Sequence, residues 1–288
     1  MNVPARHISV VIPVHNGASS ILRQLEALRV ALTGMVDCEV LVVNNRSTDD
    51  TAKLVGAWAQ DSPLSVSVVE ANDRPGEPYA RNVGWRNAEG EIILFCDADD
   101  VVAETWASGL LEALEKAEFA TGPLITESIN GPEVANVRGQ ALFQQMARLH
   151  DTVPFAHGAN MGFRRKTLET LGGFDEQFLI GCDIELAIRA WRAGIDLVWA
   201  PAAAVHYRLR STPRGVYAQA RAYGKSRSLL DAQVPEVRPS VRARRLHQVK
   251  RMIWLFRRLP QLTHLSGRLR WLWVLGQVRG ELETGRNS

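Results

Sequence analysis

Short apolar runs alternate with amphipathic segments over the first hundred residues of the chain. Residues 8–14 (ISVVIPV) are β-branched and almost wholly apolar, which is typical of a strand buried on both faces. Three similar runs follow, and apolar residues at helical spacing separate them. Strands that alternate with helices predict an α/β fold in which helices flank a mostly parallel central sheet. The strands are expected at 8–14, 39–43, 66–69 and 91–96, and the helices are expected to begin near Ile21, Asp50 and Tyr79.

The pattern is less regular after residue 100, and it becomes helical and rich in arginine beyond about Ser211. The sequence therefore predicts a globular domain over residues 1–211 and a basic amphipathic helical extension over residues 212–288. Between residue 100 and this boundary the expected elements are a strand at 119–129, a helix at 137–149 and a short strand at 197–199.

Composition places the chain among globular proteins, because 46% of its 288 residues are hydrophobic and 23% are charged. The three cysteines are widely spaced and odd in number, which excludes a disulfide framework and favours a reducing, cytoplasmic compartment. The N-terminal residues enter a predicted strand at once, so a secretory signal is not expected there. No apolar stretch reaches the roughly 18 residues that a membrane-spanning helix needs.

The most distinctive motif is CDADD at residues 96–100, which follows the last predicted strand of the alternating region. Carboxylates this close together repel one another and are costly to desolvate without a cation. Hard oxygen ligands suit Mg²⁺ or Mn²⁺, which proteins commonly hold with one or two carboxylates and substrate phosphates. The motif therefore indicates a metal site, and the alternative is an acidic surface turn or helix cap.

Three further residues are candidates for chemistry. Arg81 lies at the start of a predicted helix, where it could bind phosphate or form an ordinary salt bridge. Asp183 falls in the first turn of a later helix, where a carboxylate is either a cap or a general base. His206 follows an apolar strand-like run and is either structural or a ligand that completes a carboxylate metal site.

Six motifs in one order resemble the family 2 glycosyltransferases, which adopt the GT-A fold. The resemblance covers roughly residues 7–210, and the ordered set is far more specific than any single motif. The matching stretches are VVIPVHNG (10–17), VVNNRSTDDT (42–51), ARNVGWRNAEGEIILFCDADD (80–100), GANMGFRR (158–165), LGGFDEQF (171–178) and GCDIELAIRAWRAG (181–194).

The resemblance implies an inverting hexosyltransferase that moves a sugar from a nucleotide diphosphate donor to an acceptor hydroxyl. The donor half of the catalytic domain would span residues 1–100 and the acceptor half residues 101–211. By the same resemblance Asp183 is the catalytic base, and Asp99 and His206 hold the metal. The nucleotide-sugar contacts would come from Pro13, Val14, His15, Asn16, Asn44, Asn45, Arg81, Asp97 and Asp99, and the acceptor side from Asn160, Gly172 and Gly173.

Three departures from the family pattern affect these expectations. Members usually carry aspartate at the position of Asn44 and often glycine or asparagine at the position of Arg46, so UDP, dTDP and GDP donors all remain open. Cys182 replaces the usual glutamate beside Asp183, and Glu185 is a reserve candidate for the base. The acceptor class is also open, between glycans, lipid-linked glycans and small molecules.

Two other functions are weighed against sugar transfer. A non-catalytic nucleotide-sugar-binding scaffold or sensor is the alternative from another class, and the intact Asp97-Ala98-Asp99 motif argues against it. A nucleotidyltransferase usually needs a glycine-rich loop with lysine near the N-terminus, and the stretch VHNGASS has no lysine.

The net charge of +3 conceals a basic tail, since 16 lysines and arginines stand against four acidic residues from Arg214 onward. Apolar residues recur at helical spacing among these arginines, accompanied by tryptophan, which suits an anionic membrane surface on the cytoplasmic side. The alternatives are packing on the catalytic domain or pairing in a homodimer. Nucleic acid binding is not expected, because no stacking platform accompanies the charge. The apolar residues are Leu246, Val249, Ile253 and Phe256, then Leu262, Leu265, Leu269 and Leu272, with Trp271 and Trp273 nearby.

Overall fold

The computed structural model describes residues 7–35, 37–139 and 143–284. The chain divides into two compact units, which are described separately. The first unit comprises residues 1–125, 143–147 and 154–207, and the second comprises residues 126–142, 148–153 and 208–288. Segments from the middle of the chain thus belong to the same unit as the C-terminal helices, and the boundary predicted near residue 211 stays a prediction.

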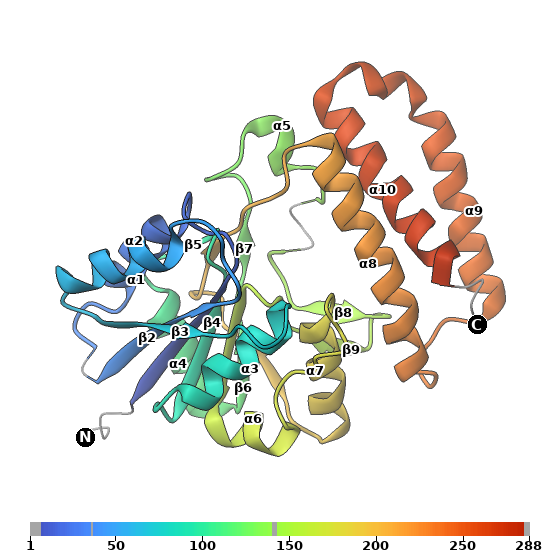
Figure 1. The fold of residues 1–288 in the computed structure, drawn as a ribbon. Coiled ribbons are helices and arrows are strands. Elements are labelled where there is room, and N and C mark those ends of the chain that lie inside the picture. Colours follow the sequence, from blue (N-terminus) through green and yellow to red (C-terminus); the bar gives the residue numbers. More distant parts are fainter. Residues whose placement is uncertain (1–6, 36, 140–142, 285–288) are drawn as a thin grey trace. The chain divides into compact units, whose positions relative to one another are not determined.

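A seven-stranded sheet forms the centre of the first unit, in the order β11-β6-β10-β4-β1-β2-β3 (Figure 1). Strand β10 is antiparallel to both of its neighbours, and the other pairs are parallel. The sheet is thus mostly parallel, as the sequence predicts. Its strands are β1 (Ile8–Val14), β2 (Cys38–Asn44), β3 (Ser65–Glu70), β4 (Ile92–Cys96), β6 (Phe119–Thr121), β10 (Asn160–Arg164) and β11 (Leu197–Trp199).

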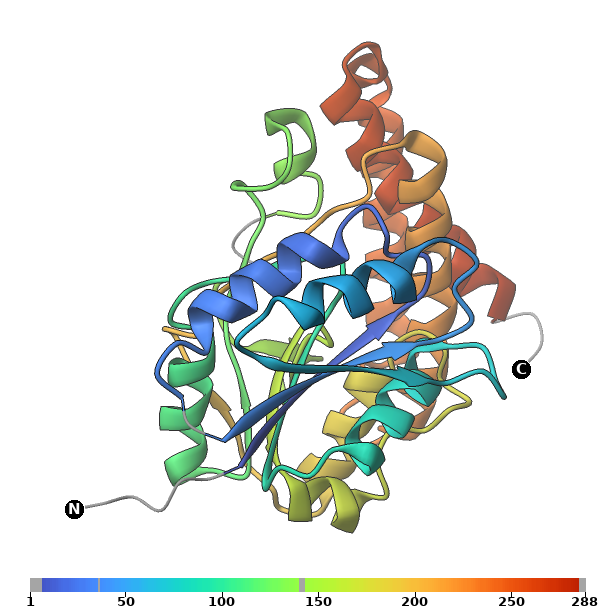
Figure 2. The same ribbon diagram turned by 60° about the vertical axis from the view of Figure 1, so that its left-hand side comes forward.

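Helices cover both faces of this sheet, and the alternation of side chains along β1 explains why (Figures 1 and 2). Val10 and Ile12 point into a core shared with α1, α2 and α4, whereas Val11 points into a second core shared with α3, α6 and α7. A strand buried on both faces has no polar side, which is the pattern of residues 8–14. The helices are α1 (Ile21–Ala31), α2 (Thr51–Gln60), α3 (Glu77–Asn87), α4 (Trp106–Lys116), α6 (Arg165–Leu171) and α7 (Cys182–Arg192).

The sheet reverses its direction of growth at β1. The chain adds β2 and then β3 on one side of β1 and returns to place β4 on the other side. In open α/β sheets the crevice at such a switch point, beyond the carboxyl ends of the strands, is where ligands bind. The polar segments after Val14 and Cys96 therefore emerge next to each other at this edge.

The chain forms two smaller sheets as well. A three-stranded sheet in the first unit pairs β12 (Val205–His206) with both β5 (Val101–Val102) and β7 (Leu124–Ile125), and a separate two-stranded sheet pairs β8 (Ala147–Leu149) with β9 (Val153–Phe155). The strand predicted at 119–129 is thus wrong in its extent, since it is divided into β6 and β7. The division falls at Gly122 and Pro123, because Pro123 has no backbone N–H and a side chain at position 122 would overlap the carbonyl oxygens of Ala200 and Ala203.

The helix predicted at residues 137–149 is also wrong within the described part of this segment. Residues 137–139 and 143–146 form no helix, and β8 occupies 147–149, while 140–142 lie outside the described residues. Gly139 has a φ of 82°, which a right-handed helix does not allow.

The second unit is helical. Close packing of α8 against α10 organises it, because a side-chain carbon at Gly224, Gly276 or Gly280 would overlap backbone atoms of the facing helix. Among the described residues no helix is both long enough and apolar enough to span a bilayer. The helices are α5 (Pro132–Ala135), α8 (Pro213–Gln233), α9 (Val241–Arg257), the 3₁₀ turn η2 (Leu259–Thr263) and α10 (Leu265–Thr284).

Candidate functional site

Arg81 on α3 joins two segments that are far apart in the sequence. The side chain is 1% exposed and donates a hydrogen bond from Nη2 to Oδ1 of Asp97 over 3.0 Å. Nη1 lies 3.5 Å from Sγ of Cys182, at the start of α7. Asp97 follows β4 and Cys182 begins α7, so the guanidinium brings the carboxylate motif and the predicted base helix to one place.

Asp183 is held in a defined orientation beside this arginine. Oδ2 accepts a hydrogen bond from the backbone N–H of Gly158 over 2.8 Å, and Oδ1 accepts one from the N–H of Ile184 over 2.9 Å. Gly158 itself lies against Arg81, since a side-chain carbon there would be 2.4 Å from Nη2. The aspartate is half-buried, which leaves part of its surface open to a ligand.

The charges around Arg81 are unevenly balanced. Burial lowers the pKa of the Arg81 guanidinium, but the nearby carboxylates of Glu77 and Asp97 outweigh burial and raise it. Burial also raises the pKa of Asp97, as does repulsion by Glu77 and Asp99, while Arg81 opposes the rise. One arginine therefore compensates only part of the negative charge that collects at the end of β4.

This donor set suits a divalent cation, which the sequence predicts here. Crowded carboxylate oxygens are hard ligands, and a cation would relieve the repulsion that raises the pKa of Asp97. His206 lies nearby through its strand, because the register pairs it with Val101, two residues beyond Asp99. Within residues 7–35, 37–139 and 143–284, no three His, Cys, Asp or Glu side chains are grouped to hold a metal. Mg²⁺ commonly takes only one or two carboxylates and completes its shell with phosphates and water.

The predicted nucleotide contacts at the ends of β1 and β2 differ in their exposure. Pro13 and Val14 are buried in β1, whereas His15 and Asn16 are exposed immediately after it. Nδ1 of His15 lies 2.8 Å from the carbonyl oxygen of Asn45, and Oδ1 of Asn16 accepts a hydrogen bond from the N–H of Thr48. The exposed pair is therefore positioned by the loop after β2.

Asn44 and Asn45 are both buried, and their side chains are already engaged. Nδ2 of Asn44 lies 3.0 Å from each carboxylate oxygen of Glu70 at the end of β3. Asn45 donates to the carbonyl oxygens of Ala71 and Arg74 and accepts from the N–H of Gly76. These amides fix the loop that leads from β3 to α3 and Arg81, and their predicted contact with a nucleotide stays a prediction.

Asn160, predicted on the acceptor side, is a fully buried residue of β10. Nδ2 donates to the carbonyl oxygens of Ala203 and Pro123, and Oδ1 accepts a hydrogen bond from the indole N–H of Trp106. The side chain thus ties three segments of the first unit together. Its acceptor role stays a prediction that these contacts do not favour.

Gly172 and Gly173 end α6 with left-handed φ angles of 75° and 76°. Helix ends commonly use glycine for this conformation, because a side chain would be strained there. The turn is held from two sides: a side chain at Gly173 would overlap Asn82 on α3, and Arg189 on α7 donates to the carbonyl oxygen of Gly173. The turn is therefore rigid, and its predicted acceptor contact stays a prediction.

Glu185, the reserve candidate for the base, is occupied by a structural ion pair. Both of its oxygens accept from Arg189 over 2.7 Å, and the carboxylate is buried. Asp183 and Glu185 lie in the same first turn of α7, so only the three-dimensional structure distinguishes the two.

Two residues of this site were missed by reasoning from the sequence. Glu77 forms an ion pair with Arg81 one helical turn later, and the i, i+4 spacing of the two was a signal for this pair. Gly158 supplies the N–H that binds Asp183, and no pattern in the sequence indicates such a backbone contact.

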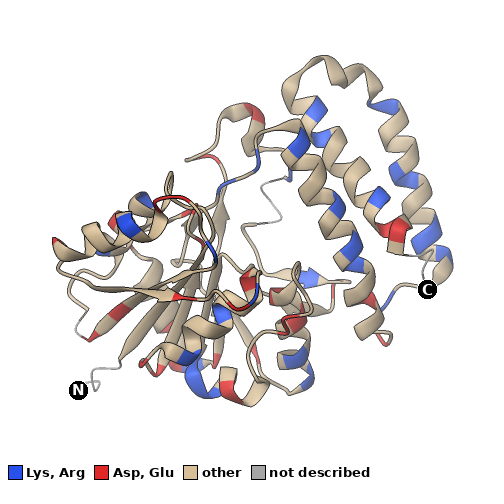
Figure 3. Ribbon diagram, in the orientation of Figure 1, with Lys and Arg blue, Asp and Glu red and all other residues tan. Residues whose placement is uncertain are grey.

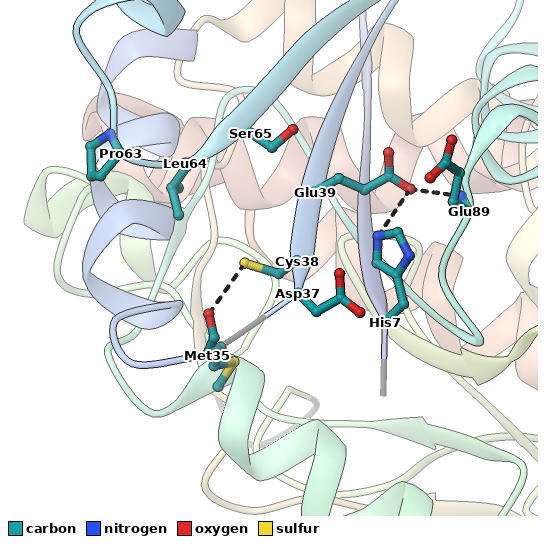
Figure 4. Close-up of a pocket in the computed structure, with 9 residues that line it drawn as sticks. All are labelled: His7, Met35, Asp37, Cys38, Glu39, Pro63, Leu64, Ser65 and Glu89. Carbon is teal, nitrogen blue, oxygen red and sulfur yellow. Dashed lines mark hydrogen bonds and ion pairs between the residues drawn. The ribbon is translucent and has the colours of Figure 1, made fainter. Parts of the chain in front are cut away.

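A pocket of about 390 Å³ lies at the other end of the strands (Figure 4). Its lining residues come from the amino ends of β1, β2 and β3, and Figure 4 shows the carboxylate of Glu39 between His7 and the backbone of Glu89. Asp97 follows the carboxyl end of β4, which is parallel to β1, so this pocket is separate from the site around Arg81.

A mostly parallel sheet with helices on both faces places the chain among the open α/β proteins, which bind their ligands at the switch point where these carboxylates lie. Comparison with known families is more specific. The model of glycosyl transferase family 2 matches residues 9–172, and that of glycosyl transferase family group 2 matches residues 92–278. The chain belongs to glycosyl transferase family 2.

Curated relatives agree with this assignment. The probable glycosyltransferase YdaM of Bacillus subtilis is 29% identical over 217 residues, which cover 68% of this chain and 49% of that protein. The pre-mycofactocin glycosyltransferase of Mycobacterium tuberculosis is 27% identical over 242 residues, which cover 80% of this chain and 49% of that protein. The chain spans about half the length of these two relatives.

Solved structures share the fold. A mannosyltransferase from Pyrobaculum calidifontis, in complex with GDP-Man and Mn²⁺, has a TM-score of 0.64 and is 19% identical; the match covers 99% of this chain and 89% of that one. TarS from S. aureus, in complex with UDP-GlcNAc, has a TM-score of 0.58 and is 16% identical; the match covers 98% of this chain and 92% of that one. At this level of identity the likeness establishes the fold, and the predicted GT-A architecture is thus confirmed.

Proposed function

We propose that this chain transfers a sugar from a nucleotide diphosphate donor to an acceptor hydroxyl, with inversion at the anomeric carbon. Membership of family 2 supports the class of reaction. The single observation that carries the assignment to residues is the position of Arg81, which contacts Asp97 after β4 and Cys182 at the start of α7.

Asp97, Arg81 and the exposed His15 and Asn16 would bind the donor at the switch point. Nε of Arg81 is buried without a hydrogen-bond partner among the described residues. The nucleobase of the donor remains open between uracil, thymine and guanine, since the Asn44 amide is engaged by Glu70. The mannosyltransferase was solved with GDP-Man and TarS with UDP-GlcNAc, so neither nucleotide is favoured by the comparisons.

Asp99 and His206 are the residues that would hold Mg²⁺ or Mn²⁺. A divalent cation bound there would supply neutralising charge for the departing diphosphate. Arg81 contributes positive charge at the same place, and it keeps Asp97 oriented through the hydrogen bond at 3.0 Å.

Asp183 would accept the proton of the acceptor hydroxyl. An inverting route needs a base on the face of the sugar opposite the leaving group, and the N–H of Gly158 together with that of Ile184 fixes the orientation of this carboxylate. Holding the acceptor and the donor in line supplies much of the remaining acceleration.

Replacement of Asp183, the proposed catalytic base, tests this proposal. We expect Asp183→Asn to lower turnover by about 10²–10⁴-fold while donor affinity is kept, because the amide cannot take the proton. Donor affinity is measured by the rise in melting temperature with UDP, dTDP and GDP in the presence of Mn²⁺, and turnover by release of the nucleotide.

Three outcomes are informative. Near-normal turnover of Asp183→Asn would remove the assignment of the base. Donor binding by the unaltered chain without any turnover or metal-dependent donor hydrolysis would favour the non-catalytic scaffold instead. No binding of any of the three nucleotides would overturn both.

A further inference from the structure

Helix α9 has one side that packs within the second unit. Arg251 forms an ion pair with Glu281 of α10 at 2.8 Å. Leu255, the next residue on this side, is buried, and its carbonyl oxygen accepts a hydrogen bond from the indole N–H of Trp271 over 2.9 Å. These contacts orient the helix about its own axis.

The opposite side of α9 is apolar and exposed. At 100° per residue its six large apolar side chains fall within an arc of roughly 140°. Scattered single hydrophobic residues are normal on a protein surface, but a contiguous stripe marks an interaction site. Each of the six side chains is more than half exposed, and that of Phe256 is 76% exposed. These residues form the α9 stripe: Val241, Leu246, Val249, Met252, Ile253 and Phe256.

Positive charge surrounds the α9 stripe. Residues 241–258 contain no aspartate or glutamate, and Figure 3 shows lysine and arginine recurring along α9. Arg242 and Arg245 project from the same arc as the stripe, and Lys250 and Arg257 border it. Long basic side chains of this kind can lay their apolar stems along a surface and extend their charged ends to anionic groups.

We propose that the α9 stripe docks into the surface of an anionic lipid bilayer, with the arginines on the lipid phosphates. An apolar arc with basic residues inside and beside it matches the acyl–headgroup boundary of such a membrane. This surface is independent of the sugar-transfer chemistry.

Charge argues against the two main rival occupants. In a two-fold dimer the same patch meets itself, which would place the arginines of one copy against those of the other. The phosphates of a nucleic acid would neutralise the arginines, but its charged backbone would not bury the apolar side chains of Ile253 and Phe256.

The structure also restricts the membrane face to α9, whereas the sequence suggested two helices and their tryptophans. Trp271 donates to the carbonyl oxygen of Leu255, and Trp273 packs edge-on against Tyr223 with Arg138 over its ring at 4.5 Å. Leu269 of α10 is fully buried. The tryptophans of α10 thus serve helix packing.

Vesicle binding of the full chain tests the proposal. We expect the chain to co-sediment at low salt with vesicles of phosphatidylcholine that contain about one third phosphatidylglycerol, and much less with phosphatidylcholine alone. The double variant Ile253→Gln, Phe256→Gln should lower the partition coefficient by at least about tenfold for each residue. The triple variant Arg242→Gln, Arg245→Gln, Lys250→Gln should also bind more weakly and lose much of the salt dependence.

A matched control uses exposed leucines outside α9. Leu229 on α8 and Leu282 on α10 are 51% and 49% exposed, and their replacement by glutamine should leave vesicle binding unchanged. Circular dichroism and melting temperature should be the same for all variants, because each altered side chain faces solvent.

Three results would overturn the proposal. The first is failure of the unaltered chain to bind anionic vesicles at low salt. The second is equal binding by the chain and the double stripe variant. The third is a concentration-dependent dimer in sedimentation velocity that the double variant abolishes, without vesicle binding, which would show that a second copy covers the stripe.

Discussion

The carboxylate of Asp183 is bound by the backbone N–H of Gly158, with 2.8 Å between the nitrogen and Oδ2. Gly158 also lies against the guanidinium of Arg81, which in turn bonds Asp97. The proposed base Asp183 on α7 and the carboxylate of Asp97 after β4 are therefore positioned by the same short chain of contacts. Disturbing any member of this chain should affect the others.

Replacement of Gly158 by alanine tests the contact directly. The new methyl group would lie 2.4 Å from Nη2 of Arg81, so either the arginine or the loop must move. We expect at least about a tenfold loss of turnover and about 1–3 kcal/mol of destabilisation, measured by nucleotide release and urea unfolding. Gly56→Ala on the exposed side of α2 is the control, because nothing lies within 4 Å of the added carbon. Equal effects of the two replacements would contradict the prediction.

Glu185→Gln should lower the stability of the chain much more than its turnover, because Glu185 forms a structural ion pair at the start of α7. The change weakens the ion pair with Arg189, which also holds the turn at Gly173, so we expect about 1–3 kcal/mol of lost stability. Turnover at a temperature where the variant is folded should remain within about tenfold of the unaltered chain. A loss as large as that of Asp183→Asn, without lower stability, would instead make Glu185 the base.

Asp99→Asn tests the metal assignment through binding alone. A nucleoside diphosphate should raise the melting temperature of the unaltered chain more with Mn²⁺ than with a chelator, because a ligand of the native state stabilises it. The variant should lose most of this metal-dependent increment. Glu104→Gln, an exposed carboxylate shortly after the motif, is the control. An unchanged increment in Asp99→Asn would show that this carboxylate does not hold the ion.

His150 in the second unit should titrate below its usual range. Burial lowers the pKa of its imidazole, and Arg227 and Arg238 lower it further, although Asp231 at 2.9 Å acts in the opposite direction. A depressed histidine pKa means that the unfolded chain binds the proton more readily. The resulting stability is present above about pH 6.5 and is lost as the pH falls through the folded-state pKa.

Titration of the histidine ring protons by NMR measures this pKa, with His150→Gln to assign the resonance. A midpoint at or above about 6.5 would contradict the prediction. In urea unfolding, the unaltered chain should lose more stability between pH 7.5 and pH 5.5 than the variant, by an amount that reports the size of the shift.

Local patterns were reliable where one physical constraint dominated. The buried strands β1, β2 and β4 were predicted because they are apolar on both faces, and the mostly parallel sheet followed from their alternation with helices. The helix predicted at 137–149 failed because Gly139 adopts a left-handed φ of 82° that turns the chain, and a pattern of apolar residues does not reveal such a turn.

The sequence by itself determined the family, the mostly parallel sheet with carboxylates after its fourth strand, and the basic helical end of the chain. These properties follow from residue types and their spacing within a single strand or helix. Only the tertiary structure decided that Asp183 rather than Glu185 is open to a ligand, that Asn160 is enclosed by the core, and that the apolar residues of α9 face outward. Such distinctions depend on which partner a side chain meets across a long stretch of sequence, and no local pattern encodes that partner.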